Sequence, residues 1–314
     1  MTTKIEWTHR PGTIGVTWNP VSGCTKISEG CQNCYAQRMA KRLAGRCGYP
    51  AAPHQFDVTL HEDKLDQPLY WKTPRTVFVC SMSDLFHPRV PLKHQVAVFR
   101  VIEQCPQHTF LMLTKRPEQM LLLEHIGGFP IYPNLWIGVT AENQRAADER
   151  IGVLLQIPAA VHFVSVEPML GPVDIQHWLG DNYSSLHGGF DDGISWTICG
   201  GESGPGARPM HPDWARGLRD QCQNAGVRYF FKQWGNWIPE SNVNTRWERG
   251  QQRSAEGMWP ESASGELVSA PSKTPPVHLW PDGSTSIRYA KRRTGRELDG
   301  REWNEYPEVD DGGE

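Results

Sequence analysis

Short apolar runs alternate with amphipathic stretches between residues 14 and 234 of the chain. The apolar runs are rich in β-branched and aromatic residues, which predicts strands buried on both faces. We expect strands at Ile14–Trp18, Val77–Cys80, Thr109–Leu113, Leu135–Val139, Val161–Val166, Trp196–Cys199 and Arg228–Lys232. The intervening stretches predict helices at about residues 32–45, 91–104, 117–125, 142–157 and 212–225. This alternation predicts an α/β fold with a parallel sheet, either a full or partial barrel or a doubly wound sheet.

Three segments depart from the alternation. Residues 46–75 carry several prolines and histidines and predict an insertion after the first helix. Residues 171–195 are rich in Gly and Asp and predict a loop over the active face of the sheet. Residues 238–314 are rich in Ser, Pro, Gly, Arg and Trp, which predicts an irregular extension with little core. We therefore expect an α/β domain at residues 1–237 and a C-terminal extension at residues 238–314.

Composition narrows the class of protein. Hydrophobic residues make up 38% and charged residues 21% of the 314 residues, which is typical of a soluble globular protein. No apolar run is long enough to cross a membrane, and the polar start of the chain does not resemble a secretory signal. We therefore expect a cytoplasmic protein without a membrane partner. In a reducing compartment its eight cysteines are expected to bind metal, pack or react rather than form disulfides.

The most informative motif is a group of three cysteines that follows the first predicted strand. Cys24, Cys31 and Cys34 fall within eleven residues and run into the first predicted helix. Gly23 and Gly30 precede two of them, where the absence of a Cβ lets a loop wrap closely around a ligand. A helix N-terminus stabilises thiolates and negatively charged clusters. The spacing therefore predicts one metal-binding unit.

The number of thiols favours an iron–sulfur cluster as the metal. Three thiolates suit a [4Fe-4S] cluster that leaves one iron open for a ligand. Structural zinc needs four ligands, and a second Cys-x-x-Cys pair is absent from the sequence. His54 or His61 could supply a fourth ligand, although their spacing does not indicate this. The remaining alternative is three buried cysteines that bind no metal.

Polar residues follow the predicted strands, at the edge where parallel sheets bind ligands. The candidates are Ser81, Ser83, Asp84, Lys115, Glu142, Glu167, Gly200, Gly201, Glu202 and Lys232. We expect them to share one site, although single members could be ordinary helix caps or loop residues. Lys115 and Lys232 suit a carboxylate or a phosphate. Cys80 and Cys199, also at strand ends, are either hydrogen-atom donors or small buried hydrophobes.

A basic run near the C-terminus is a second candidate for function. It comprises Arg288, Lys291, Arg292, Arg293, Arg296 and Arg301. Tyr289 and Trp303 lie among these residues, and basic side chains with aromatics suit phosphate contact and base stacking. The alternative is a solvated surface segment that the acidic residues after it balance.

The cysteine motif resembles that of the radical S-adenosylmethionine superfamily, whose usual signature is C-x3-C-x2-C after the first strand of a partial (β/α) barrel. The first spacing here is six residues, and the aromatic residue, Tyr35, follows the last cysteine. The whole chain is similar to a phage and bacterial family of three-Cys-motif proteins without an assigned function. The matching stretches are WNPVSGCTKISEGCQNCYAQRMAKR, SMSDLFHP, LTKRPE, SVEPMLGP, CGGESGPGARP, FFKQWG and GRELDGREWNEYP.

The resemblance implies a parallel partial barrel of six to seven strands and a [4Fe-4S] cluster that binds and cleaves S-adenosylmethionine. It implies metal ligation by Cys24, Cys31 and Cys34. Cofactor contacts are expected at Ser81, Ser83, Asp84, Glu142, Gly200, Gly201 and Glu202, and catalytic roles at Cys80, Lys115, Glu167 and Lys232. We expect an enzyme that uses an electron donor and modifies or repairs a nucleic acid or nucleotide. The alternatives are a metal-stabilised nucleic-acid-binding protein without catalysis and a redox or regulatory cluster protein.

Overall fold

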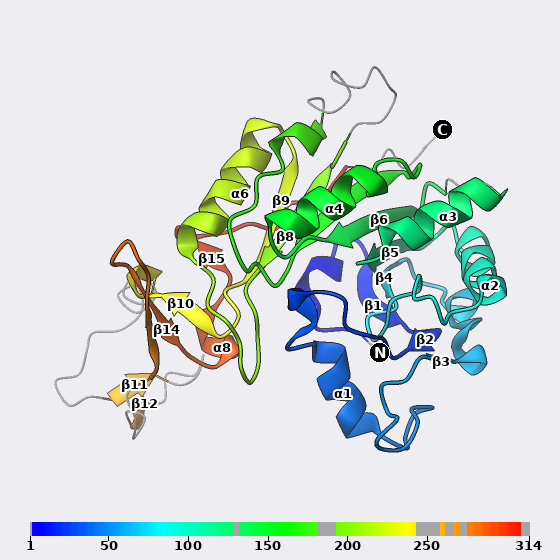
Figure 1. Ribbon diagram of the computed structural model, residues 1–314, viewed down its shortest axis with the longest axis horizontal. Helices are drawn as coiled ribbons and strands as arrows, with labels where there is room; N and C mark the ends of the chain where they lie inside the picture. The colour runs from blue at the N-terminus through cyan, green and yellow to red at the C-terminus, as the bar shows by residue number, and fades with distance from the viewer. Residues whose placement is uncertain are drawn as a thin grey trace.

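The computed structural model describes residues 2–127, 132–180, 193–242, 258–260, 267–269 and 275–308. Within these residues, seven parallel strands form one sheet that curls into a half-barrel (Figure 1). The strands lie side by side in chain order: β1 (Ile14–Trp18), β4 (Arg75–Val79), β5 (Thr109–Thr114), β6 (Leu135–Thr140), β7 (Val161–Val166), β8 (Trp196–Gly200) and β9 (Arg228–Gln233). β1 and β9 form its two edges. The parallel partial barrel expected from the sequence is confirmed.

Helices in the connections between strands cover one face of this sheet (Figure 1). They are α2 (Leu92–Glu103), α3 (Pro117–Gly127), α4 (Gln144–Leu154) and α6 (Pro212–Asn224). The helix α1 (Tyr35–Leu43) lies apart from them, and its Ala36 and Ala40 form a separate small cluster with Tyr49 and Met82. Apolar residues of the four covering helices join alternate strand residues in the main hydrophobic core; they include Ile102, Met120, Ile151 and Leu218. Because successive side chains of a strand point to opposite faces, each strand supplies this core with every second residue.

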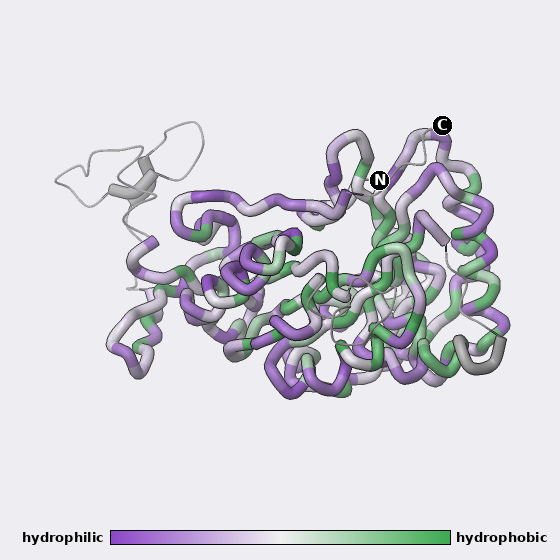
Figure 2. Tube along the Cα trace, turned by 90° about the horizontal axis from the view of Figure 1, so that it is seen from above, coloured by the Kyte–Doolittle hydropathy of each residue, from purple (hydrophilic) through white to green (hydrophobic). Residues whose placement is uncertain are grey.

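The opposite, concave face of the sheet carries a second core that is mainly aromatic. Trp196 lies at its centre, with ring centroids 5.9 Å from Trp136 and 5.7 Å from Phe163. Trp7, from the short helix η1 (Glu6–Thr8), and Tyr306 pack against these rings. Figure 2 shows the hydrophobic positions concentrated in the strands and the helices beside them. Large rings therefore fill the interior of the half-barrel.

The predicted insertion at residues 46–75 packs beneath the start of the cysteine loop. Its strand β3 (Thr59–Leu60) pairs with β2 (Val21–Ser22), and the short helices η3 (Glu62–Lys64) and η4 (Gln67–Tyr70) follow. The predicted loop at 171–195 contains η5 (Gln176–Trp178), while its residues 181–192, including the Gly188-Gly189 and Asp191-Asp192 pairs, lie outside the described residues.

The described part of the C-terminal extension contains short antiparallel sheets. β10 (Trp237–Pro239), β14 (Thr285–Arg288) and β13 (Val277–Leu279) form one sheet, and β11 (Met258–Pro260) pairs with β12 (Leu267–Ser269). The helix α8 (Lys291–Thr294) precedes a hairpin of β15 (Glu297–Leu298) and β16 (Arg301–Glu302). The sequence predicts an irregular segment with little core here, but Leu298 is fully buried and Trp303 packs on the main core.

Candidate functional site

The cysteine loop lies over the carboxyl ends of the strands. After β2, the Gly23 N–H donates to the Met82 carbonyl over 3.0 Å, and the Cys24 N–H donates to the Phe56 carbonyl over 3.2 Å. Cys31 ends the short helix η2 (Glu29–Cys31), and Cys34 is the N-cap of α1. All three cysteines are free thiols that are partly exposed. The predicted metal-binding unit is therefore reachable from solvent.

Cys24 lies against a buried ion pair at the ends of β4 and β5. The Arg116 Nη1 is 3.6 Å from the Cys24 Sγ and 3.1 Å from a carboxylate oxygen of Asp84. Burial raises the pKa of the Cys24 thiol, the negative charges of Asp84 and Cys31 add to this, and Arg116 opposes it. Cys24 and Cys31 are thus within electrostatic reach of each other.

The Asp84 carboxylate already accepts hydrogen bonds from four neighbouring residues. It accepts from the Phe86 N–H, the Thr114 hydroxyl, the Lys115 N–H and the Arg116 guanidinium. Arg116 also donates to the carbonyl and hydroxyl oxygens of Thr25, directly after Cys24. Removing one member of a buried ion pair costs about 3–5 kcal/mol, because the other charge is left unpaired. Asp84 and Arg116 therefore hold the first part of the cysteine loop on the sheet.

Glu142 holds the middle of the loop in the same way. It accepts from the Arg150 guanidinium over 2.8 Å and from the Gly30 N–H over 3.4 Å, and it is 1% exposed. Burial acts to raise the Glu142 pKa, but the Ser28 hydroxyl and the charges of Arg150 and Lys115 outweigh this and lower it. The carboxylate therefore stays ionised beside the loop.

The surroundings of the Cys31 thiol lower its pKa. Burial acts to raise its pKa, but the charge of Lys115 and hydrogen bonds from the Ile27 and Ser28 backbone together bring the pKa below its ordinary value. The Ser28 hydroxyl lies 3.7 Å from the Cys31 Sγ. Thiolates, not thiols, bind metals, so these contacts favour the ligating form.

Glu202, at the end of β8, holds the last part of the loop. Its carboxylate accepts from the Asn33 side chain over 3.0 Å and from two nitrogens of Arg208 over 2.9 and 2.6 Å. Arg208 also donates to the Glu29 carbonyl over 3.1 Å. Asp84, Glu142 and Glu202, predicted to contact a cofactor, are thus each paired with an arginine, and Glu142 and Glu202 also accept from residues of the cysteine loop.

The ends of β7 and β9 carry a separate ion pair. The Lys232 Nζ lies 2.8 Å from a carboxylate oxygen of Glu167, and the Gln233 side chain donates to the other oxygen over 3.3 Å. Gly200 makes room for this carboxylate, because a Cβ there would lie 3.2 Å from the Glu167 Cδ. Gly201 packs against the Trp234 carbonyl, 2.1 Å from where its Cβ would lie.

The two predicted serines also have protein partners. The Ser81 hydroxyl donates to the Asn19 side chain over 3.1 Å, and the Ser83 hydroxyl donates to the Val21 carbonyl over 2.8 Å. Both bonds tie the end of β4 to the segment that leads into the cysteine loop. Their predicted contact with a cofactor remains a prediction.

Cys80 and Cys199 lie in the main hydrophobic core, 4% and 0% exposed. Burial raises the pKa of each thiol to about 12, so both are protonated near neutral pH. Of the two histidines considered as metal ligands, His61 is buried 2.7 Å from the Ser22 hydroxyl, and His54 pairs with Asp57 on the surface. These partners explain both histidines without a metal.

The spacing of the three loop thiols can be compared with that of zinc ligands. Three potential metal ligands lie close together in the described part of the chain: the ligand atoms of His211, Asp213 and Asp282 are all within 4.8 Å of one another. The three loop cysteines do not form such a group. At least one pair of loop thiols is therefore further apart. Tetrahedral zinc with 2.3 Å bonds brings thiolates to about 3.8 Å. As placed, the three thiols are therefore not all at the spacing of ligands on one zinc ion, and the iron–sulfur cluster stays a prediction.

His211 and its two carboxylate neighbours form a hydrogen-bonded helix cap. The His211 Nδ1 accepts from the Asp213 N–H at the start of α6, and the Nε2 lies 3.1 Å from Asp282 and 3.2 Å from Ser284. Both ring nitrogens have protein partners, so the group is explained without an ion.

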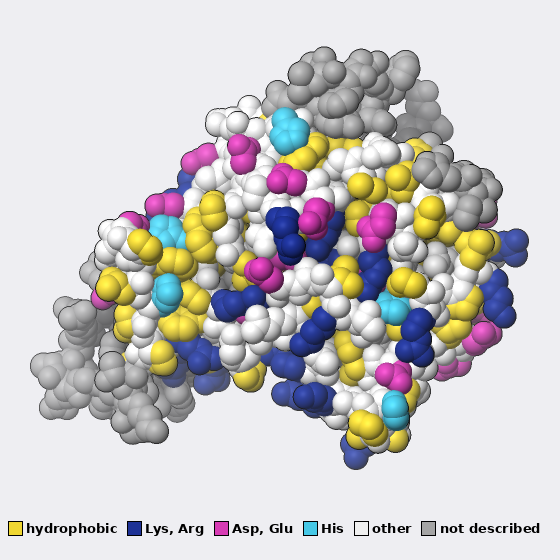
Figure 3. Space-filling model, in the orientation of Figure 1, with side chains coloured by type: hydrophobic (Ala, Val, Ile, Leu, Met, Phe, Trp, Pro, Cys, Tyr) yellow, Lys and Arg dark blue, Asp and Glu magenta, His cyan; other side chains and the backbone are white. Residues whose placement is uncertain are grey.

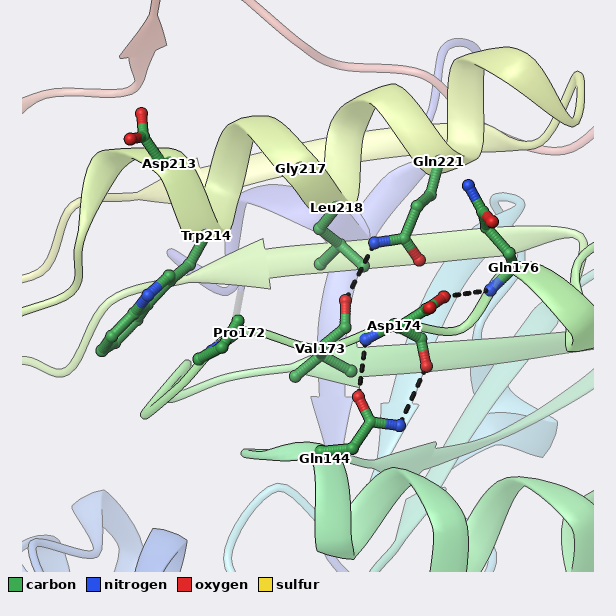
Figure 4. Close-up of a pocket in the computed structure, with 10 residues that line it drawn as sticks. All are labelled: Gln144, Pro172, Val173, Asp174, Gln176, Asp213, Trp214, Gly217, Leu218 and Gln221. Carbon is green, nitrogen blue, oxygen red and sulfur yellow. Dashed lines mark hydrogen bonds between the residues drawn. The ribbon is translucent and has the colours of Figure 1, made fainter.

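A cavity of about 410 Å³ lies between α6 and the segment at residues 172–176 (Figure 4). The amides of Gln144 and Gln221, two of its lining residues, are bonded to backbone groups of that segment. Its lining includes none of the residues predicted for the site. We therefore regard it as a structural cavity outside the candidate site.

Sequence reasoning missed three of the residues that hold the loop, namely Asn33, Arg150 and Arg208. Arg116 stands in the polar Thr-Lys-Arg stretch after β5, where its position at a strand end already marks it as a candidate. Arg150 looks like a solvent-facing residue of an amphipathic helix, yet it is 6% exposed and bonded to Glu142. Only the folded structure brings such partners together.

Fold and site together define an α/β half-barrel protein with a three-thiol loop over the carboxyl ends of its strands. The profile of one family, described as "Protein of unknown function (DUF5131)", matches residues 2–307. The chain therefore belongs to this family. Neither a curated protein nor a solved structure matches the chain. None of the helices in the described ranges is long and apolar enough to cross a membrane.

Proposed function

We propose that the chain is an iron–sulfur enzyme of the radical S-adenosylmethionine type, with a [4Fe-4S] cluster on Cys24, Cys31 and Cys34. One observation carries this proposal: three partly exposed thiols of one loop lie over the carboxyl ends of a parallel half-barrel, where such folds bind ligands. The donor set fits the group, because three thiolates leave one iron free to bind a cofactor. When bound and reduced by an external electron donor, the cluster supplies the electron that cleaves S-adenosylmethionine into methionine and a 5′-deoxyadenosyl radical.

The residues of this chain would fix the position of that chemistry. The loop is tied to three strand ends by Asp84, Glu142 and Glu202, so its thiols are held before a cofactor binds. Such preorganisation reduces the ordering that binding has to bring about. Lys115 and Lys232 offer ammonium groups for an anionic part of the cofactor or substrate. Glu167, which already holds Lys232, orients the second of these.

The test is the metal and cofactor chemistry of the full chain purified without oxygen. After incubation with iron and sulfide, we expect about four irons per chain. After addition of dithionite and S-adenosylmethionine, we expect 5′-deoxyadenosine, measured by chromatography. Cys31→Ser should lose most of the iron and abolish 5′-deoxyadenosine, because two thiolates do not hold the cluster.

Cys47→Ser is the matched control, because Cys47 is an exposed free thiol outside the three-thiol loop. It should retain both iron and activity. Stoichiometric zinc in place of iron, or equal iron in the Cys31 and Cys47 variants, would contradict the proposal.

A further inference from the structure

Two segments of the chain carry positive charge without any acidic residue. Between Glu29 and Asp57 the sequence has four basic residues and no Asp or Glu: Arg38, Lys41, Arg42 and Arg46. Between Asp282 and Glu297 it has five basic residues and again no Asp or Glu: Arg288, Lys291, Arg292, Arg293 and Arg296. The whole chain has a formal net charge of −3, so these segments stand out from the average. The first contains α1, which begins at the last cysteine of the loop.

The fold brings these two segments to the same loop, which follows β8. Arg38 on α1 donates to the Ser203 carbonyl over 3.0 Å, and Arg288 on β14 donates to the Gly204 carbonyl over 3.5 Å. Gly204 has a φ of +101°, and a Cβ there would lie 1.6 Å from the Arg38 Nη1. A side chain at this position would strain the backbone and displace the guanidinium.

The same loop also reaches the cysteine motif. Asn33 directly precedes Cys34, and its side chain donates to the Gly206 carbonyl over 2.9 Å. Figure 1 shows α1 and α8 on either side of the loop that follows β8. The two basic segments are therefore neighbours of each other and of the proposed cluster.

Much of this positive charge lacks a compensating carboxylate. Within the described residues, neither Arg42 nor Arg292 forms an ion pair, and both are exposed. By contrast, Arg216 and Arg219 on α6 are both paired with Asp299. Figure 3 shows Lys and Arg side chains gathered over the lower middle of the molecule, with few Asp or Glu side chains among them. Uncompensated basic side chains attract a polyanion.

Two aromatic rings, one exposed and one partly buried, accompany the charges. Tyr35 follows Cys34 directly and is 59% exposed. The ring of Trp237 lies 5.9 Å from the Arg288 guanidinium, and its indole N–H donates to the Ala207 carbonyl in the loop after β8. Phosphate-binding arginines interleaved with exposed rings are the arrangement by which proteins bind single-stranded nucleic acid. A duplex keeps its bases stacked and could not offer them to these rings.

We propose that the surface formed by α1, the loop after β8 and the α8 segment binds single-stranded nucleic acid and leads a base to the three-thiol loop. Phosphates lie along Arg38, Arg42, Arg288 and Arg292, and a base stacks on Tyr35 at the rim of the site. This names the substrate class of the proposed enzyme and rests on the proposed function for its chemistry. Binding itself needs no cofactor cleavage, so the two proposals can fail separately.

The test is fluorescence anisotropy of a short labelled single-stranded oligonucleotide with the full chain, purified without oxygen and with its iron content measured, between about 50 and 200 mM salt. In the double variant Arg42→Glu with Arg292→Glu, affinity should fall roughly tenfold or more. The slope of log affinity against log salt should become shallower by about 0.7 for each phosphate that the variant no longer binds. Tyr35→Ala should weaken binding by roughly fivefold or more, as expected for one stacked base.

Matched controls separate this surface from a general effect of charge. Lys93→Glu with Arg100→Glu changes the net charge equally but alters exposed positions of α2. This variant should bind within about twofold of the unaltered protein, since charges beyond a Debye length are screened. Tyr70→Ala, at a ring that is 77% exposed on η4, is the control for Tyr35→Ala and should have no effect.

The outcomes distinguish the two proposals. Equal losses of affinity in the two double variants, tighter binding to a duplex of the same sequence, or no binding at low salt would each overturn the proposed surface. A chain that forms 5′-deoxyadenosine yet does not bind the oligonucleotide refutes this inference alone. A chain that binds as expected but holds no iron refutes the proposed function alone.

Discussion

At the residue scale, Gly23 determines whether the cysteine loop can leave β2 in the observed direction. Its φ is +81°, and a Cβ there would lie 2.1 Å from the Asp57 carbonyl oxygen. A side chain at this position meets both a strained backbone and an immovable backbone atom. Gly12 has a similar φ of +76° but has no atom within 4 Å of its Cβ position. An alanine at Gly12 therefore measures the free-energy cost of backbone strain alone, and an alanine at Gly23 measures strain and clash together.

We predict that Gly23→Ala lowers the free energy of unfolding by roughly 3 kcal/mol, because strain of about 1–2 kcal/mol is combined with overpacking of about 1–3 kcal/mol. Gly12→Ala should lower it by about 1 kcal/mol, from strain alone. Denaturant titration of both variants measures these values, and iron content should fall only in the Gly23 variant. Equal destabilisation by the two substitutions would show that the loop adapts to the added methyl group.

The sequence predicts the candidate site at this scale only in part. The three cysteines are recognisable because their spacing is local in the chain. The carboxylates at the strand ends are also recognisable, because a polar residue after an apolar strand marks the ligand-binding edge. Their arginine partners are not, since Asp84 and Arg116 are 32 positions apart and nothing in the sequence indicates that the two side chains meet. Which strand-end groups hold the loop depends on tertiary contacts.

At the scale of elements, the hairpin of β15 and β16 is attached to α6 through its turn. Asp299 in the turn lies 2.8 Å from Arg216 and 2.6 Å from Arg219. Partial burial acts to raise the Asp299 pKa, but hydrogen bonds from these two arginines outweigh it and hold the pKa below its ordinary value. The Asp299 backbone has a φ of 54°, a conformation that Asn also tolerates. Asp299→Asn therefore removes the charge and leaves the turn intact.

We predict that Asp299→Asn lowers the free energy of unfolding by about 0.5–1 kcal/mol at neutral pH, a modest value because the side chain is partly exposed. A carboxylate whose pKa is lowered on folding stabilises the protein above its unfolded pKa of about 3.9. The difference between the two proteins should therefore be constant above that pH and vanish as the pH falls through the lower folded pKa. Denaturant titrations at several pH values measure it. A difference that persists in acid would contradict the electrostatic explanation.

The elements of the half-barrel could be predicted from the sequence because their signals are strong. Strands buried on both faces are continuous apolar runs, and the observed β1 and β7 begin and end at the predicted residues. The strands of the C-terminal extension are two to four residues long, and β10 and β14 pair across more than 40 residues. Neither length nor periodicity identifies such strands. Their formation depends on a surface that the barrel provides.

At the scale of the whole molecule, the two ends of the described chain meet on the concave face of the half-barrel. The Tyr306 ring lies 5.6 Å from both Trp196 and Phe230. Its hydroxyl donates to the His9 carbonyl over 3.2 Å, so the C-terminal segment also holds the N-terminal one. The Asn304 backbone forms a bridge with Phe230 on β9. The extension therefore closes the aromatic core that the sheet alone leaves open.

We predict from this closure that Tyr306→Ala lowers the free energy of unfolding by roughly 3 kcal/mol, since a large ring is removed from an aromatic core. Tyr306→Phe keeps the ring and loses only the hydrogen bond, which contributes about 1 kcal/mol. Tyr70→Ala, at an exposed ring, should change the free energy of unfolding by less than about 0.5 kcal/mol. Denaturant titration measures the three values. If Tyr306→Ala costs no more than Tyr70→Ala, the C-terminal segment only rests on the barrel. A loss of stability in Tyr306→Ala that Tyr306→Phe does not share would instead show that the C-terminal segment is part of the aromatic core of the half-barrel.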